Sequence, residues 1–215
     1  MKVMVLGSCR VYDPLKNYRE TVLFKGGRVH TSTQIIQAFN IMSGNLKIPQ
    51  DIFKYALRGT EKKTYLIYDF LEIDFFIMEI CSVKNFYFNN YNSISLGTDR
   101  WAKKDKFKEK IIIRKETNDE LFYNLNKINL IINRKPCLFV SHNNIPNLEN
   151  RDLLINNLSL WCEKNDKYFL DPTGLIKKYG VRKCFKPKND CNHYSRNFRR
   201  EMRRYFKTFL KELKI

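Results

Sequence analysis

The sequence predicts an α/β fold, a three-layer α/β/α sandwich in which helices cover both faces of a five-stranded parallel sheet. Five short runs are apolar, rich in β-branched and aromatic residues, and lack strict alternation, so they indicate strands buried on both faces. Most of these runs are followed by a polar turn and then by apolar residues at helical spacing. Strands that alternate with helices are joined by right-handed crossovers into a parallel sheet.

The predicted strands end in polar turns. In chain order they span residues 2–6, 21–24, 64–68, 137–140 and 167–170. Ligands of open α/β sheets bind outside the carboxyl ends of the strands. The candidate site residues are therefore the polar groups that follow these runs, which include Ser8, Cys9, Gly27, Asp69 and Asn143.

Helices are predicted between and after the strands. They comprise residues 34–39, a helix that begins at the capping-box motif Thr117-x-x-Glu120, residues 151–164 and residues 195–214. Ser32 or Thr33 can cap the first of them. The last carries a row of arginines beside an aromatic stripe, which is typical of a helix with one buried face and one solvated basic face.

Residues 75–115 do not fit the alternation of strands and helices. They are predicted to be an insertion within a single domain that comprises residues 1–215. No repeat or low-complexity linker divides the chain.

The composition is strongly basic, with 40 Lys and Arg against 22 Asp and Glu and a net charge of +18. Such a charge attracts phosphorylated ligands, acidic glycans, anionic lipid surfaces and nucleic acid. The sequence lacks RNP-like or base-reading motifs, so nucleic acid is the least favoured partner, and peripheral membrane contact stays open. The apolar N-terminal stretch is too short for a secretory signal or a membrane span, and the protein is expected to be cytoplasmic.

The six cysteines include no Cys-x-x-Cys pair, which favours reduced thiols over a disulfide framework. Cys184, Cys191 and His193 fall one ligand short of a four-ligand zinc site, so no metal is predicted.

Two short motifs carry the candidate chemistry. Asp190 and His193 lie three residues apart before the last helix, where the aspartate can orient the imidazole and the imidazole can exchange a proton with a nucleophile. The nucleophile would come from Ser8 or Cys9, at the end of the first strand. His142 and His30 are rival bases, and His142 is interpreted as a turn residue packed on the rim of the site.

This combination resembles the SGNH (GDSL-like) hydrolase superfamily. Its members carry a nucleophile in a Gly-x-Ser motif after the first strand and an Asp-x-x-His near the C-terminus, on a flavodoxin-like five-stranded parallel sheet. The alignment places Cys9 at the nucleophile position, with Ser8 as the alternative. The Gly-Ser-Cys form resembles the branch that includes GSCFA-domain proteins and capsular polysaccharide acetyltransferases, some of which bind coenzyme A.

The resemblance implies an enzyme that transfers an acyl group, with acetyl the first candidate, from acyl-CoA to a sugar hydroxyl in surface polysaccharide biosynthesis. Cys9 would attack, His193 would act as base and acid, and Asp190 would orient it. The alternatives are a carbohydrate esterase or deacetylase, which uses water, and a non-catalytic module that binds nucleic acid or an anionic glycan.

The resemblance also implies donors for the oxyanion. The backbone amides of Cys9 and Arg10 are the first candidates. The superfamily's glycine would be Gly27, or its role would pass to Ser32. Asp69 stands where the superfamily has an asparagine, and an ionised carboxylate cannot donate, so Asn143 is the candidate substitute.

Overall fold

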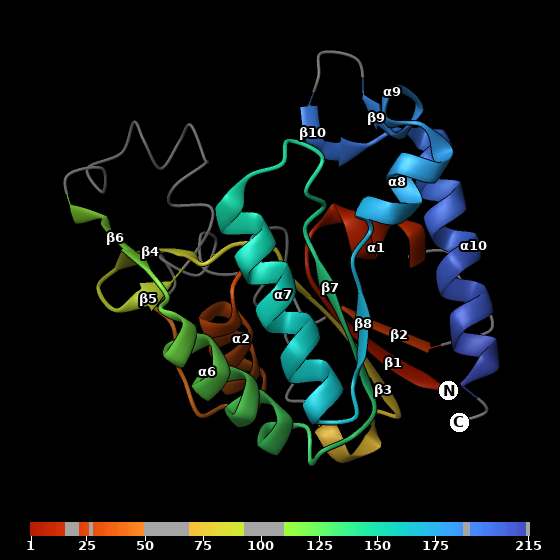
Figure 1. The fold of residues 1–215 in the computed structure, drawn as a ribbon. Coiled ribbons are helices and arrows are strands. Elements are labelled where there is room, and N and C mark those ends of the chain that lie inside the picture. The colour runs from red at the N-terminus through yellow and green to blue at the C-terminus, as the bar shows by residue number, and fades with distance from the viewer. Residues whose placement is uncertain (16–21, 26–27, 50–68, 93–109, 187–189, 214–215) are drawn as a thin grey trace.

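The computed structural model describes residues 1–15, 22–25, 28–49, 69–92, 110–186 and 190–213. Its central feature is a parallel β-sheet, as predicted for the α/β class (Figure 1). Every hydrogen-bonded pair of strands in this sheet is parallel, and the strand order is β2-β1-β3-β7-β8. The strands are β1 (Lys2–Leu6), β2 (Val22–Lys25), β3 (Phe75–Ile80), β7 (Cys137–Ser141) and β8 (Tyr168–Leu170).

Helices cover both faces of the sheet (Figure 1). One face is covered by α2 (Ser32–Met42), α6 (Asn118–Ile131) and α7 (Glu149–Lys164). The other is covered by α1 (Cys9–Leu15), α8 (Thr173–Tyr179) and α10 (Arg196–Glu212). The described residues thus form the three layers that the sequence predicts.

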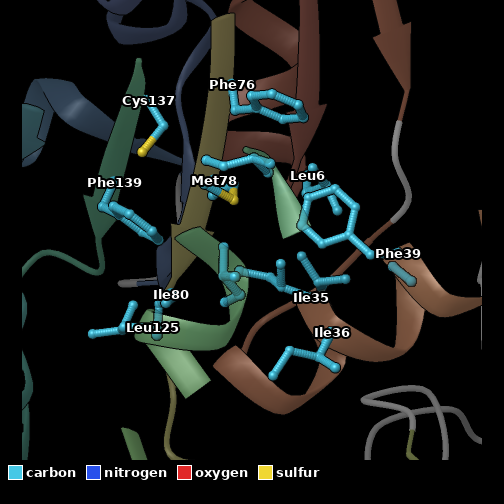
Figure 2. Close-up of a cluster of buried hydrophobic side chains, with 14 of the residues drawn as sticks. Leu6, Ile35, Ile36, Phe39, Phe76, Met78, Ile80, Leu125, Cys137 and Phe139 are labelled. Carbon is cyan, nitrogen blue, oxygen red and sulfur yellow. The ribbon is translucent and has the colours of Figure 1, made fainter. Parts of the chain in front are cut away.

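Alternate residues of the central strands enter two separate hydrophobic cores. Met78 of β3 packs with Phe39 of α2 and Leu125 of α6 in the first core (Figure 2). Ile77, the preceding residue, packs in the second core with residues of α1 and α10, including Phe198. Burial on both faces explains why these strands read as continuous apolar runs.

Two smaller sheets accompany the main one. Strands β4 (Lys84–Phe88), β5 (Tyr91–Asn92) and β6 (Ile112–Lys115) form an antiparallel sheet in the order β5-β4-β6. Near the C-terminus, the short helix α9 (Val181–Cys184) leads into the antiparallel pair β9 (Phe185–Lys186) and β10 (Asp190–Tyr194). A 3₁₀ turn, η2 (Phe70–Glu72), precedes β3.

The central strand of the sheet is not the one that the sequence predicted. Residues 64–68 lie outside the described residues, and Phe75–Ile80, which was assigned to an insertion, forms β3 between β1 and β7. All six of its residues are buried. Its glutamate, Glu79, hides the strand in the sequence, because a lone carboxylate is not expected in a doubly buried strand.

The predicted helices are present as α2, α6, α7 and α10, with small shifts of their ends and one different cap. Thr117 and Glu120 form the expected capping box of α6. Ser195 caps α10, where its hydroxyl accepts a hydrogen bond from the backbone N–H of Phe198. The cap of α2 is Thr31 rather than Ser32 or Thr33, because the chain is already helical at Ser32.

No described helix is long and apolar enough to cross a membrane.

Candidate functional site

Polar residues gather where β1 and β3 end side by side. The chain leaves β1 toward β2 on one side and later places β3 on the other, so the crossovers diverge at this point. Ligands bind at such switch points, outside the carboxyl ends of the strands. Ser8 and Cys9 follow β1 here, Glu79 is the penultimate residue of β3, and His142 follows β7.

Gly7 allows the turn after β1 to lie directly against β3. A Cβ atom at this position would lie 2.4 Å from Cγ2 of Val11 and 2.7 Å from Cβ of Glu79. No side chain fits in that space, so glycine is required by the close approach of the two segments.

Glu79 binds the turn through both of its carboxylate oxygens. Oε2 accepts a hydrogen bond from the backbone N–H of Ser8 at 2.6 Å, and Oε1 accepts one from Nε of Arg10 at 2.6 Å. Burial alone would raise the pKa of Glu79, but the charge of Arg10 and the hydrogen bonds from Ser8 hold it below its ordinary value. Glu79 is therefore a carboxylate at neutral pH. Arg10 is buried and paired with Glu79.

His142 belongs to this buried network, which corrects its interpretation as a turn residue on the rim. Its Nε2 lies 2.9 Å from Nη1 of Arg10, and its Nδ1 lies 2.8 Å from the carbonyl oxygen of Asn143. A guanidinium can only donate, so Nε2 accepts and the proton resides on Nδ1. Burial and the charge of Arg10 lower the pKa of His142 to about 4. The imidazole is neutral, and its lone pair is already engaged.

His30 is a second neutral imidazole beside the network. Its carbonyl oxygen accepts hydrogen bonds from the backbone N–H groups of Cys81 (2.9 Å) and Ser82 (3.0 Å), which follow β3. Burial lowers the pKa of His30 to about 4, although the nearby charge of Glu79 opposes the shift.

Cys9 is the first residue of α1 and is partly accessible to solvent. The other described cysteine side chains, Cys81, Cys137, Cys162 and Cys184, are free thiols and buried. Burial raises the pKa of Cys9; Arg10 lowers it and Glu79 raises it. The resting thiol is therefore protonated, and its activation requires a base.

The element that carries Asp190 and His193 lies beside α1. These residues belong to β10, which directly precedes the last helix, and β10 packs next to α1 (Figure 1). His193 is exposed, and Asp190 is described by its backbone only. The next residue, Tyr194, is buried near Arg10 and Glu79, where its ring packs edge-on against Phe198. Tyr194 thus anchors β10 next to the turn; a Cys9–His193 hydrogen bond remains a prediction.

The candidate oxyanion donors differ in the hydrogen bonds that they already make. The backbone N–H of Arg10 donates to Oγ of Ser8 at 3.2 Å. Among the described residues, none accepts a hydrogen bond from the backbone N–H of Cys9. Asn143 is fully buried after β7, and its Oδ1 accepts from the backbone N–H of Ile145 at 3.3 Å. Of the two backbone candidates, the Cys9 amide is the one that no described residue engages.

Ser32 and Asp69 are not brought to this cluster. Oγ of Ser32 donates to Glu116 at 2.8 Å in a separate buried network at the start of α2. Asp69 is exposed and caps η2, before β3 begins, so it lies at the opposite edge of the sheet from Ser8. That expectation is corrected because it depended on a strand ending at Asp69. Gly27 lies outside the described residues.

Glu79 is the residue that sequence reasoning missed. Its signal was present, because a buried charge within an apolar run requires a partner. That partner, Arg10, is 69 residues away and follows the candidate nucleophile.

Among the described residues, no group of three His, Cys, Asp or Glu side chains could hold a metal ion.

The parallel sheet, with its polar cluster at the β1–β3 switch point, is consistent with an SGNH-like α/β fold. A family model for the TviD N-terminal domain matches residues 1–96 and 95–208. These segments include almost all of the chain, which therefore belongs to the TviD N-terminal domain family. No curated protein matches significantly.

Solved structures of Axe2, an acetyl-xylooligosaccharide esterase from Geobacillus stearothermophilus, share this fold. A variant with an arginine replaced by alanine has a TM-score of 0.53 and 14% identity, over 95% of this chain and 91% of that chain. A catalytic variant with a histidine replaced by alanine has a TM-score of 0.50 and 14% identity over the same shares. At such identities the likeness shows the fold alone.

Proposed function

We propose that this protein transfers an acyl group, first of all acetyl, to a sugar hydroxyl, with Cys9 as the nucleophile. The observation that carries the proposal is the position of Cys9, a partly accessible thiol at the carboxyl end of β1, on an element that packs beside β10. Two likenesses support the substrate class. The family model is associated with a Vi capsular polysaccharide acetyltransferase, and Axe2 is an acetyl-xylooligosaccharide esterase.

In the first step, His193 accepts the proton of the Cys9 thiol while Asp190 orients the imidazole. The thiolate attacks the carbonyl carbon of an acyl-CoA donor, a bond forms between this carbon and Sγ, and the bond to the sulfur of coenzyme A breaks. The leaving thiolate takes the proton from His193. The backbone N–H of Cys9 donates to the oxyanion.

In the second step, a sugar hydroxyl attacks the thioester on Cys9 and gives its proton to His193. The bond between the acyl carbon and Sγ breaks, the sugar ester leaves, and the imidazolium returns a proton to the thiolate. Water in place of the sugar gives the esterase alternative, which has the same covalent intermediate.

The structure supports His193 over His142 as the base. Nε2 of His142 already accepts from Arg10, and to take a proton it would have to abandon a buried hydrogen bond. His193 is exposed on the neighbouring element and can approach without disturbing the network. Cys9 is favoured over Ser8 for a similar reason. Ser8 is buried, and its Oγ accepts from the Arg10 amide.

The test is release of coenzyme A from acetyl-CoA, with and without glycan acceptors. Release that depends on acceptor, is lost in Cys9→Ala and is slowed in His193→Ala supports transfer. Cys184→Ala is the matched control, because that thiol is buried and bonded to the carbonyl oxygen of Ile176. Turnover that survives Cys9→Ala refutes the proposal. Multiple-turnover release without acceptor, beyond the single equivalent that acylates Cys9, favours the esterase. Salt-sensitive DNA binding without acyl chemistry favours a binding module.

A further inference from the structure

A single carboxylate binds the residues on both sides of Cys9. Oε2 of Glu79 accepts from the backbone of Ser8, the residue before Cys9, and Oε1 accepts from the side chain of Arg10, the residue after it. Both bonds are 2.6 Å long. Since Glu79 belongs to the central strand β3, Cys9 lies between two attachments to the most enclosed part of the sheet.

This attachment is buried and further braced. The side chain of Glu79 is 0% exposed and that of Arg10 is 6% exposed, so solvent and salt screen the pair weakly. Nη1 of Arg10 bonds in turn to His142, on β7's carboxyl side. The turn that carries Cys9 is thereby connected to two neighbouring strands.

A purely structural explanation accounts poorly for this pair. An apolar pair of similar volume is often as stable as a buried ion pair, because both charges must be desolvated. The carboxylate of Glu79 makes two directional hydrogen bonds, which fix the backbone of Ser8 before Cys9 and the side chain of Arg10 after it. An apolar contact could not hold the turn in one orientation in this way.

We propose that Glu79 is a positioning residue that holds Cys9 in the orientation from which its thiolate attacks the acyl donor. This inference deepens the proposed function and rests on it. Glu79 touches neither the thiol proton nor the substrate in this mechanism, and it acts through Ser8 and Arg10.

Removal of the charge at residue 79 should have two opposite effects. Glu79 raises the pKa of Cys9 and Arg10 lowers it. Glu79→Gln therefore leaves the effect of Arg10 unopposed and increases the thiolate fraction. It also removes one attachment, because glutamine offers one acceptor oxygen and an NH2 group that can only donate, so either Ser8 or Arg10 loses its acceptor. A residue that acts only on thiol ionisation would raise reactivity and turnover together.

The experiment compares alkylation of Cys9 with acyl transfer in the full chain. Iodoacetamide labelling of the Cys9 peptide is followed by mass spectrometry across pH, and kcat and KM are measured with acetyl-CoA and an acceptor glycan. For Glu79→Gln we expect a lower alkylation pKa and a kcat reduced about a hundredfold, as expected for a misplaced reacting group, with KM unchanged. Glu116→Gln is the matched control: that buried carboxylate binds Ser32 and Thr33 elsewhere, and its loss should leave Cys9 alkylation unchanged.

Glu79→Asp keeps the inference testable if Glu79→Gln does not fold. It retains the charge but is one methylene too short to reach both partners, so kcat should fall while the alkylation pKa stays near that of the parent protein. Turnover unchanged in both folded variants overturns the inference and leaves the proposed function standing. Absence of acyl transfer in the parent protein, with alkylation that shifts as described, overturns the proposed function while Glu79 still controls Cys9.

Discussion

Replacement of Gly7 by alanine tests the close approach on which the candidate site depends. The new methyl group would lie 2.4 Å from Cγ2 of Val11 and 2.7 Å from Cβ of Glu79. Both neighbours belong to the packed interior of α1 and β3, and neither is the end of a flexible side chain. The turn after β1 must therefore move away from β3, which stretches both hydrogen bonds to Glu79.

The expected loss of stability follows from the size of this overlap. Overpacking a core by one methyl group costs about 1–3 kcal/mol, which for a chain of this length corresponds to a fall in Tm of roughly 2–12 °C. Gly174→Ala is the matched control, because nothing lies within 4 Å of its added Cβ and the residue is helical. That change should stabilise the protein by up to about 1 kcal/mol. Urea denaturation of the two variants measures both values, and a Gly7→Ala protein as stable as its parent would refute the packing argument.

Two further predictions concern acid stability and helix capping. Because the pKa values of His30 and His142 are lowered to about 4 from 6.5, the unfolded chain binds protons that the folded chain does not. The free energy of unfolding should therefore stay constant above pH 6.5 and fall as the pH drops toward 4. His142→Gln should make this fall shallower. An unchanged dependence of the free energy of unfolding on pH would contradict the lowered pKa of His142. Thr117→Ala removes the capping box of α6 and should cost about 1 kcal/mol in urea denaturation. A loss near zero would show that the cap is dispensable.

The fold could be predicted wherever local pattern and tertiary environment agree. The run before Gly7 and the run at Cys137 are apolar throughout, and both form buried strands. The capping box at Thr117 is a local interaction, so its residues alone specify it. The central strand β3 failed this test, because Glu79 is tolerated there only through Arg10, which precedes it by 69 residues.

In the candidate site, too, the positions set by the order of strands could be predicted, and the contacts between residues distant in sequence could not. The rule that parallel strands end at a common edge brings Ser8, Cys9 and Asn143 to one end of the sheet. The rule placed Asp69 there as well, and it was wrong because Asp69 precedes β3 and therefore lies at the other edge of the sheet. The role of His142 could not be read from its position in a turn, since it depends on the direction of the Arg10 guanidinium.

The charges around Cys9 support the proposal that the base for its thiol comes from β10. Arg10 and Glu79 act on the thiol with opposite sign, and burial leaves its pKa raised. The network beneath Cys9 can therefore orient the sulfur but does not ionise it. The lone pair of His142 is engaged by Arg10, and the pKa values of His142 and His30 are both lowered to about 4, so the network offers only weak bases. A nucleophile at this position depends on a base from outside the network, and among the elements that pack against α1, β10 carries the exposed His193.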